Sequence, residues 1–157
     1  VVISINITTN INSDLVDYYV ISHNTKFLSE SKQYSALSKP IILPKCRFTK
    51  EELSLFDKVK LVDYGLEVKT KTLSSHGIHS IIPHDITAAY ILAALLESDV
   101  QSIYLAGFDG YSQDDIRHQE MVEIFNLYNS NDGRSKLISI TPTTYPINKG
   151  SVYAPIG

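Results

Sequence analysis

Residues 85–111 carry the clearest structural pattern in the chain, and they read DITAAYILAALLESDVQSIYLAGFDGY. The segment from Asp85 to Ser98 is apolar almost all round, which predicts a helix buried against a sheet. Ser102 to Gly107 follows as a nearly continuous apolar run, which is typical of a strand buried on both faces. A helix that leads into such a strand indicates a βαβ crossover and a parallel sheet.

The rest of the chain repeats this alternation. Strands are predicted at 1–6, 18–22, 40–44, 59–64 and 137–140, helices at 25–34, 49–56 and 114–128, and polar turns at 8–13 and 129–135. Asn24 is a good helix cap, and Thr49 forms a capping box with Glu52. Residues 65–84 are the least regular. We therefore predict an α/β fold, a three-layer Rossmann-like single domain over residues 1–157, with about five to seven mostly parallel strands and helices on both faces.

Composition excludes several classes of protein. The net charge of −3 argues against a general nucleic-acid binder, which needs a basic face. The longest apolar run, from Ala88 to Leu96, has nine residues and is too short for a membrane span. A single cysteine, Cys46, excludes an internal disulfide and a cysteine-based zinc site. With no pattern typical of a signal peptide, we expect a cytoplasmic protein. Because the chain opens inside a strand, at Val1, we also expect it to be part of a longer polypeptide.

Polar side chains follow several predicted strands at the point where each strand ends. In an open parallel sheet, ligands bind beyond the carboxyl ends of the strands. Asn6 and Asn24 follow the first two strands, and Asp109 follows the strand at 102–107. Asp109 either binds a sugar hydroxyl or a metal, or it fixes the turn. Tyr111 either stacks on a base or sugar, or it covers the edge of the core.

The start of the helix predicted at 85–98 is a second candidate site. A helix N-terminus gathers free N–H groups and a partial positive charge, which suit a phosphate or carboxylate. Asp85 either belongs to such a site or caps the helix. His84 is either a general acid or base, or an exposed turn residue. His76 and His79 have a spacing that does not converge on an ion in a loop, so we predict no metal site.

Common cofactor signatures are missing from the sequence. It contains neither GxxxxGK[ST] nor GxGxxG, and no glycine precedes Gly65. The usual phosphate-cradling loop after a first strand is therefore absent, and we predict no cofactor for this part of the chain.

Two segments carry a family resemblance, SIYLAGFDGY at 102–111 and LISITPTTYP at 137–146. They resemble the C-terminal region of bacterial aldolase-like proteins of the HMG-CoA-lyase superfamily, often described as 4-hydroxy-2-oxovalerate aldolases and found with surface-polysaccharide genes. Segments 2–6 and 18–24 also resemble that region. In those proteins the aldolase barrel lies upstream. The resemblance thus implies an accessory C-terminal domain whose partner is an upstream aldolase domain of the same chain, and whose own residues include none of the aldolase's catalytic or metal-binding groups.

More distantly, the layout resembles family-42 bacterial sialyltransferases. The loop similar to residues 107–111 lies near the CMP-sugar site in those enzymes. The resemblance implies ligand-facing positions here for Asn6, Asn24, Thr87, Asp109 and Tyr111. The glycine-rich loop that those enzymes carry before their first strand has no counterpart in this sequence.

Three functional hypotheses follow. The first is an accessory domain of an aldolase-like lyase in surface-polysaccharide metabolism, with a nucleotide sugar or sugar phosphate as its ligand. The second is a glycosyltransferase-like domain that uses a CMP-sugar, with His84 or His79 deprotonating the acceptor hydroxyl. The third is a structural or oligomerisation module, such as a homo-oligomer interface, which predicts an exposed apolar patch at the strand edge.

Overall fold

The computed structural model describes residues 1–8, 11–131 and 135–153 of the chain. The predicted turns at 8–13 and 129–135 lie partly outside the described residues, at positions 9–10 and 132–134. Strands and helices alternate along most of the chain, so the α/β class is confirmed. Within the described part, neither the apolar helix α4 (Thr87–Leu95) nor any other helix has the length and apolar character that a membrane crossing requires.

The first half of the chain forms a four-stranded parallel sheet with the order β1-β2-β3-β4. Its strands are β1 (Ile3–Ile5), β2 (Tyr18–Val20), β3 (Ile41–Leu43) and β4 (Leu61–Asp63). The connections contain the 3-10 turns η1 (Ser13–Leu15) and η2 (Lys45–Arg47) and the helices α1 (Asn24–Ser29), α2 (Ser31–Ser35) and α3 (Lys50–Ser54). Because the four strands run in the same direction, their carboxyl ends lie along one edge of the sheet.

Of the two helix caps predicted in the first half of the chain, one is confirmed and one is wrong. The capping box is confirmed, since Thr49 Oγ1 accepts from the Glu52 amide at 3.1 Å and Glu52 Oε2 accepts from the Thr49 amide at 2.8 Å. The prediction of Asn24 as a cap is wrong. His23 occupies the cap position in extended conformation, and Asn24 is already helical. The helix predicted at 25–34 is divided at Glu30, whose backbone leaves the helical region.

Both faces of the four-stranded sheet are covered. Side chains of adjacent residues point to opposite faces of a strand. Tyr19 and Ile41 accordingly share one buried cluster with residues of α1–α3, whereas Val20 and Ile42 pack in a second cluster with residues of α4. The first cluster centres on Phe27, whose ring stacks on that of Phe56 at 3.8 Å. The sheet therefore lies between helices, in the three layers expected from the sequence.

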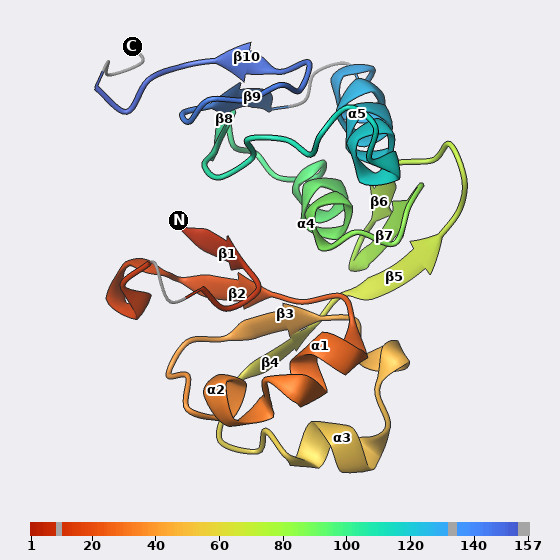
Figure 1. Ribbon diagram of the computed structural model, residues 1–157. Coiled ribbons are helices and arrows are strands. Elements are labelled where there is room, and N and C mark those ends of the chain that lie inside the picture. The colour runs from red at the N-terminus through yellow and green to blue at the C-terminus, as the bar shows by residue number, and fades with distance from the viewer. Residues whose placement is uncertain (9–10, 132–134, 154–157) are drawn as a thin grey trace.

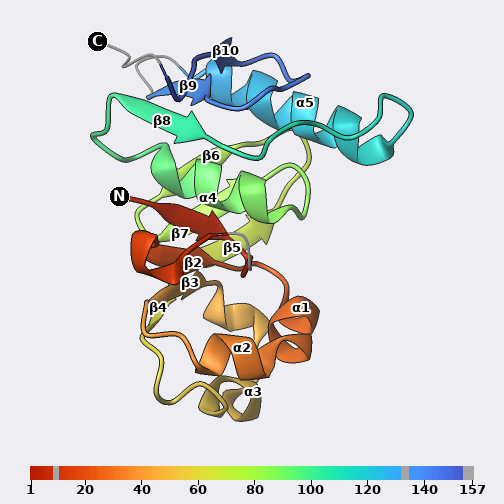
Figure 2. The ribbon, with the colours of Figure 1, turned by 60° about the vertical axis from the view of Figure 1, so that its left-hand side comes forward.

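Figures 1 and 2 show how these layers are arranged in space. The helices α1–α3 lie at one end of the molecule, the β1–β4 sheet comes next, and α4 lies near the middle. The strands from β8 (Ser102–Leu105) to β10 (Asn148–Lys149) and the helix α5 (Ile116–Asn129) form the opposite end.

The helix α4 (Thr87–Leu95) is the central element of the fold. Every residue from Thr87 to Ala93 is buried, which confirms the prediction of a helix enclosed by the core. It begins later than expected, because the cap position is held by Ile86. The interpretation of Asp85 as the helix cap is therefore wrong, and its carboxylate is used elsewhere.

Residues 65–82 form a small sheet that the sequence did not predict. Its strands are β5 (Gly65–Val68), β6 (Ser74–His76) and β7 (His79–Ile82), with β7 central, parallel to β5 and antiparallel to β6. These strands contain many polar residues, and only positions such as Leu66 and Ile82 reach the core shared with α4. A Cβ atom at position 65 would lie 2.2 Å from the ring of His79, so a larger residue than Gly65 would force that ring to move.

The last part of the chain forms a three-stranded parallel sheet. Its elements are β8 (Ser102–Leu105), β9 (Lys136–Ser139), β10 (Asn148–Lys149) and the helix α5 (Ile116–Asn129). Leu105 is buried, but Tyr104 is 50% exposed, so the prediction that this strand is buried on both faces is wrong. The ten described strands fall into three hydrogen-bonded groups instead of the single sheet of five to seven strands that we expected.

Candidate functional site

The carboxyl end of β2 meets the start of α4 through a buried hydrogen bond. Ser22 follows β2 and is fully buried, and its hydroxyl group lies 2.8 Å from that of Thr87. Thr87 is the first residue of α4. This contact positions the helix N-terminus against the edge of the parallel sheet, where ligands bind in open α/β folds.

The first turn of α4 has free hydrogen-bond donors. Ile86 at the cap position has no side-chain acceptor. The first hydrogen bond of the helix runs from the Tyr90 amide to the Ile86 carbonyl, at 3.1 Å. Among the described residues, the amides of Thr87, Ala88 and Ala89 have no acceptor. Unpaired N–H groups at a helix N-terminus attract an anion, because the helix dipole adds a partial positive charge there.

A cluster of charged residues surrounds this turn. Arg47 Nη1 lies 2.7 Å and 2.9 Å from the two carboxylate oxygens of Asp85, and 3.4 Å from the Ser22 carbonyl. His23 Nδ1 lies 3.9 Å from Asp85. The structure thus brings the predicted residues Asp85 and Thr87 to one place. His23, which follows the strand predicted at 18–22, lies there as well. The structure adds Ser22 and Arg47, which the sequence reasoning missed, although Arg47 could have been found by applying the strand-end rule to the strand at 41–43.

Asn6 and Asn24 follow the neighbouring strands β1 and β2. Asn6 has φ near 60°, a conformation that asparagine tolerates better than most residues, and its amide donates to the Val20 carbonyl at 3.0 Å. Its Oδ1 atom is buried and has no partner in the described part of the chain. Asn24 is partly exposed at the start of α1. Both residues lie at the expected edge of the sheet.

Asp109 and Tyr111 belong to a separate loop after β8. This loop is fastened to residues 141–145: Gly107 N donates to Thr141 Oγ1 at 3.0 Å, and Thr144 N donates to the Asp109 carbonyl at 3.1 Å. Gly110 is required there, since its φ is +111° and a Cβ atom would lie 2.0 Å from Thr144 Oγ1. The Asp109 side chain is exposed, and its carboxylate has no hydrogen bond or ion pair to any described residue. 

Arg117 covers one face of the Tyr111 ring, with its guanidinium carbon 4.3 Å from the ring centre. Only the other face is left for stacking on a base or sugar. Between described residues, no hydrogen bond or ion pair joins the 107–111 loop to the cluster around Asp85 and Thr87.

The two candidate bases lie at opposite ends of β7. His84 follows the strand, but its Nε2 atom lies 2.8 Å from Glu123 of α5 and its Nδ1 atom 3.7 Å from Glu120. Both ring nitrogens thus face carboxylates. His79 is the first residue of β7, and its Nε2 atom lies 3.8 Å from Glu67. Across the described ranges, no three His, Cys, Asp or Glu side chains are placed to hold one metal ion.

Tyr90, one turn into α4, is a structural residue and not an acid or base. Burial raises the pKa of its hydroxyl group above the ordinary value, and the hydroxyl donates to the Tyr64 carbonyl. This bond ties α4 to the segment between β4 and β5 and holds the helix in place behind the site.

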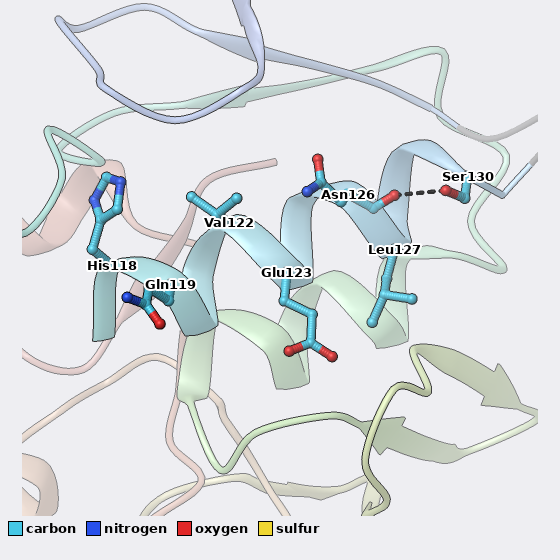
Figure 3. Close-up of a pocket in the computed structure, with 7 residues that line it drawn as sticks. All are labelled: His118, Gln119, Val122, Glu123, Asn126, Leu127 and Ser130. Carbon is cyan, nitrogen blue, oxygen red and sulfur yellow. Dashed lines mark hydrogen bonds between the residues drawn. The ribbon is translucent and has the colours of Figure 1, made fainter. Parts of the chain in front are cut away.

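The described surface also has a shallow hollow of about 530 Å³ along α5. Figure 3 shows that the side chains around it come from this one helix and from Ser130, the residue that follows its last turn. They are His118, Gln119, Val122, Glu123, Asn126, Leu127 and Ser130. None of the residues predicted from the sequence lines this hollow, although Glu123 contacts His84.

No family model, no curated protein and no solved structure matches this chain. The chemistry of the site is therefore argued from its own residues and geometry.

Proposed function

We propose that this domain binds a sugar phosphate or nucleotide sugar at the carboxyl edge of its parallel sheet. The observation that carries the proposal is the uncapped first turn of α4, held against the end of β2 by the Ser22–Thr87 hydrogen bond. Three amides there have no acceptor among the described residues, and a phosphate oxygen would supply one. Asn6 and Asn24, on neighbouring strand ends, are side chains that suit the hydroxyl groups of a sugar.

The parent protein and metabolic role that we propose for this domain rest on the resemblance of segments 102–111 and 137–146 to aldolase-like proteins. We propose that the domain is the accessory C-terminal part of such a lyase, acts in surface-polysaccharide metabolism in the cytoplasm, and itself carries no lyase activity. The isolated chain should accordingly bind a phosphorylated sugar and fail to cleave an aldol substrate. Aldol cleavage by the isolated chain would contradict the accessory role.

Two alternatives have no specific observation in their favour. A sialyltransferase-like reaction needs a base free to take a proton from the acceptor, but both ring nitrogens of His84 face carboxylates. His79 lies at the amino end of β7, away from the strand ends that carry the other candidate residues. An oligomerisation module would need an apolar patch at the strand edge, whereas that edge carries Arg47, Asp85 and His23.

The experiment that tests the proposal uses the missing helix cap. Isothermal calorimetry would compare glucose 1-phosphate, CMP and UDP-glucose with neutral glucose, for the natural chain and for Ile86→Thr. The threonine hydroxyl supplies an acceptor to the first turn of α4 and competes with the ligand. Since such a cap contributes about 1 kcal/mol, we expect binding to weaken by about fivefold.

Ile86→Val is the matched control, because valine has the shape of threonine without the hydroxyl group. Its affinity should equal that of the natural chain. Equal affinities for Ile86→Thr and Ile86→Val would place the ligand elsewhere, and no binding of any phosphorylated compound at millimolar concentration would refute the proposed function.

A further inference from the structure

Arg47 stands out as a cation that is held in place but only partly used. It ends the short turn η2, which is fixed at its start because the Lys45 amide donates to Asp63 Oδ1 at 3.0 Å. The turn closes through the Arg47 amide, which donates to the Pro44 carbonyl at 3.0 Å. The backbone therefore places the guanidinium beside the start of α4, and its side chain is only 26% exposed.

The side-chain hydrogen bonds that Arg47 makes to described residues all involve one nitrogen atom. Nη1 contacts both oxygens of Asp85 and the Ser22 carbonyl. Nε and Nη2 have no partner among the described residues, and neither is a buried atom, so they face solvent. A guanidinium has five N–H donors in a rigid plane, and three of them, on Nε and Nη2, remain available here.

Those free donors form the edge that binds an anion with two neighbouring oxygens. Carboxylate and phosphate groups accept two parallel N–H bonds from such an edge, and these charge-assisted bonds are the strong ones. A lysine at this position would supply charge without that geometry. The contact with Asp85 holds the guanidinium group in place through Nη1. Little side-chain freedom is therefore lost when a ligand binds.

We propose that Arg47 is the residue that recognises the ligand's phosphate group, through its Nε–Nη2 edge, and that it selects phosphate esters over neutral sugars. This inference rests on the proposed function. It assigns the specificity to a residue outside the sequence-predicted set. It also assigns Asp85 to holding Arg47 and not to contact with the ligand.

The test compares Arg47→Lys and Arg47→Ala with the control Lys58→Ala. Lys58 is an exposed cation between α3 and β4, and its removal leaves the cluster around Arg47 intact. Titrations would use inorganic phosphate and glucose 1-phosphate, with neutral glucose as the blank. We expect Arg47→Lys to bind about tenfold more weakly, the effect of losing one charge-assisted hydrogen bond, and Arg47→Ala to lose measurable binding. Lys58→Ala should bind as the natural chain does.

A spectroscopic measurement separates contact from a general loss of stability. The Nε–H signal of Arg47, assigned by its absence from the Arg47→Lys spectrum, should shift on addition of phosphate and not of glucose. An unchanged signal, or binding by Arg47→Ala with the natural affinity, would overturn this inference and leave the proposed function standing. Failure of the natural chain to bind any phosphate compound would overturn both.

Discussion

The hydroxyl groups of Ser22 and Thr87 lie 2.8 Å apart in the buried interior, although the two residues are separated by 65 positions in the sequence. Their hydrogen bond connects the end of β2 to the first residue of α4. Removing one partner leaves a buried hydroxyl group without its bond, which costs more than removing both. The effect of substitutions at these two residues on stability therefore tests whether the start of α4 lies against the end of β2.

Replacement of either hydroxyl should destabilise the domain. We expect Ser22→Ala and Thr87→Val each to lower the free energy of unfolding by about 1–3 kcal/mol. The double variant should lose less than the sum of the two, because it leaves no unpaired group. Urea unfolding of the four proteins measures this coupling. Strictly additive losses would show that the two hydroxyl groups do not interact.

The burial of α4 predicts a severe effect at its centre. Leu92 is 1% exposed, and Leu92→Asp places an unpaired charge in the core, at a cost of several kcal/mol. We expect no cooperative thermal transition in circular dichroism. Leu55→Asp is the control, since Leu55 is 59% exposed and the same substitution there should change stability by less than about 0.5 kcal/mol. A folded Leu92→Asp protein would contradict the burial of this helix face.

The loop after β8 should not tolerate a side chain at Gly110. Its positive φ disfavours other residues, and the added Cβ atom would lie 2.0 Å from Thr144 Oγ1. We expect Gly110→Ala to destabilise the domain by about 2 kcal/mol or more. Gly77→Ala has a positive φ but no atom within 4 Å, so it isolates the conformational cost of about 1 kcal/mol. 

Thr144→Ala removes the oxygen that the new methyl group would meet. The double variant Gly110→Ala/Thr144→Ala should therefore be less destabilised than the sum of its two single changes, as measured by thermal unfolding. Equal effects of Gly110→Ala and Gly77→Ala would show that Thr144 does not approach the loop.

The stability contributed by the cap of α5 should be lost at acid pH. Hydrogen bonds from Arg117 lower the pKa of Asp115, the cap of this helix, from its ordinary 3.8 to about 2. A carboxyl group whose pKa is lower in the folded state stabilises the fold above its unfolded pKa, and that stabilisation is lost as the pH falls through the folded pKa. We therefore expect this contribution to disappear between pH 3.8 and about 2.

Urea midpoints measured across that pH range would check this expectation. Asp115→Asn keeps a capping side chain but cannot titrate, so its midpoint should fall less steeply than that of the natural chain. Asp114→Asn, at an exposed neighbour, should behave as the natural chain does. Parallel curves for all three proteins would mean that Asp115 carries no such linkage.

Local patterns in the sequence were good guides to the elements they specify. The Thr49–Glu52 capping box and the buried helix of residues 87–95 are both present, because each depends on side chains within a few positions of one another. The sheet of β5–β7 was missed for the opposite reason. Its polar strands are held by their pairing with β7 and by α4, and neither partner leaves a local hydrophobic pattern.

The alternation of apolar segments with capped helices determined, by the sequence alone, that this protein has an α/β fold with helices on both faces of a parallel sheet. Only the tertiary structure decided which polar groups share a site. Arg47 and Asp85 are 38 positions apart, and the order of β2, β3 and α4 in space brings their side chains to within 2.7 Å. The same arrangement turns His84 toward Glu123 of α5. Contacts of this kind depend on the packing of distant elements, and no spacing along the chain encodes them.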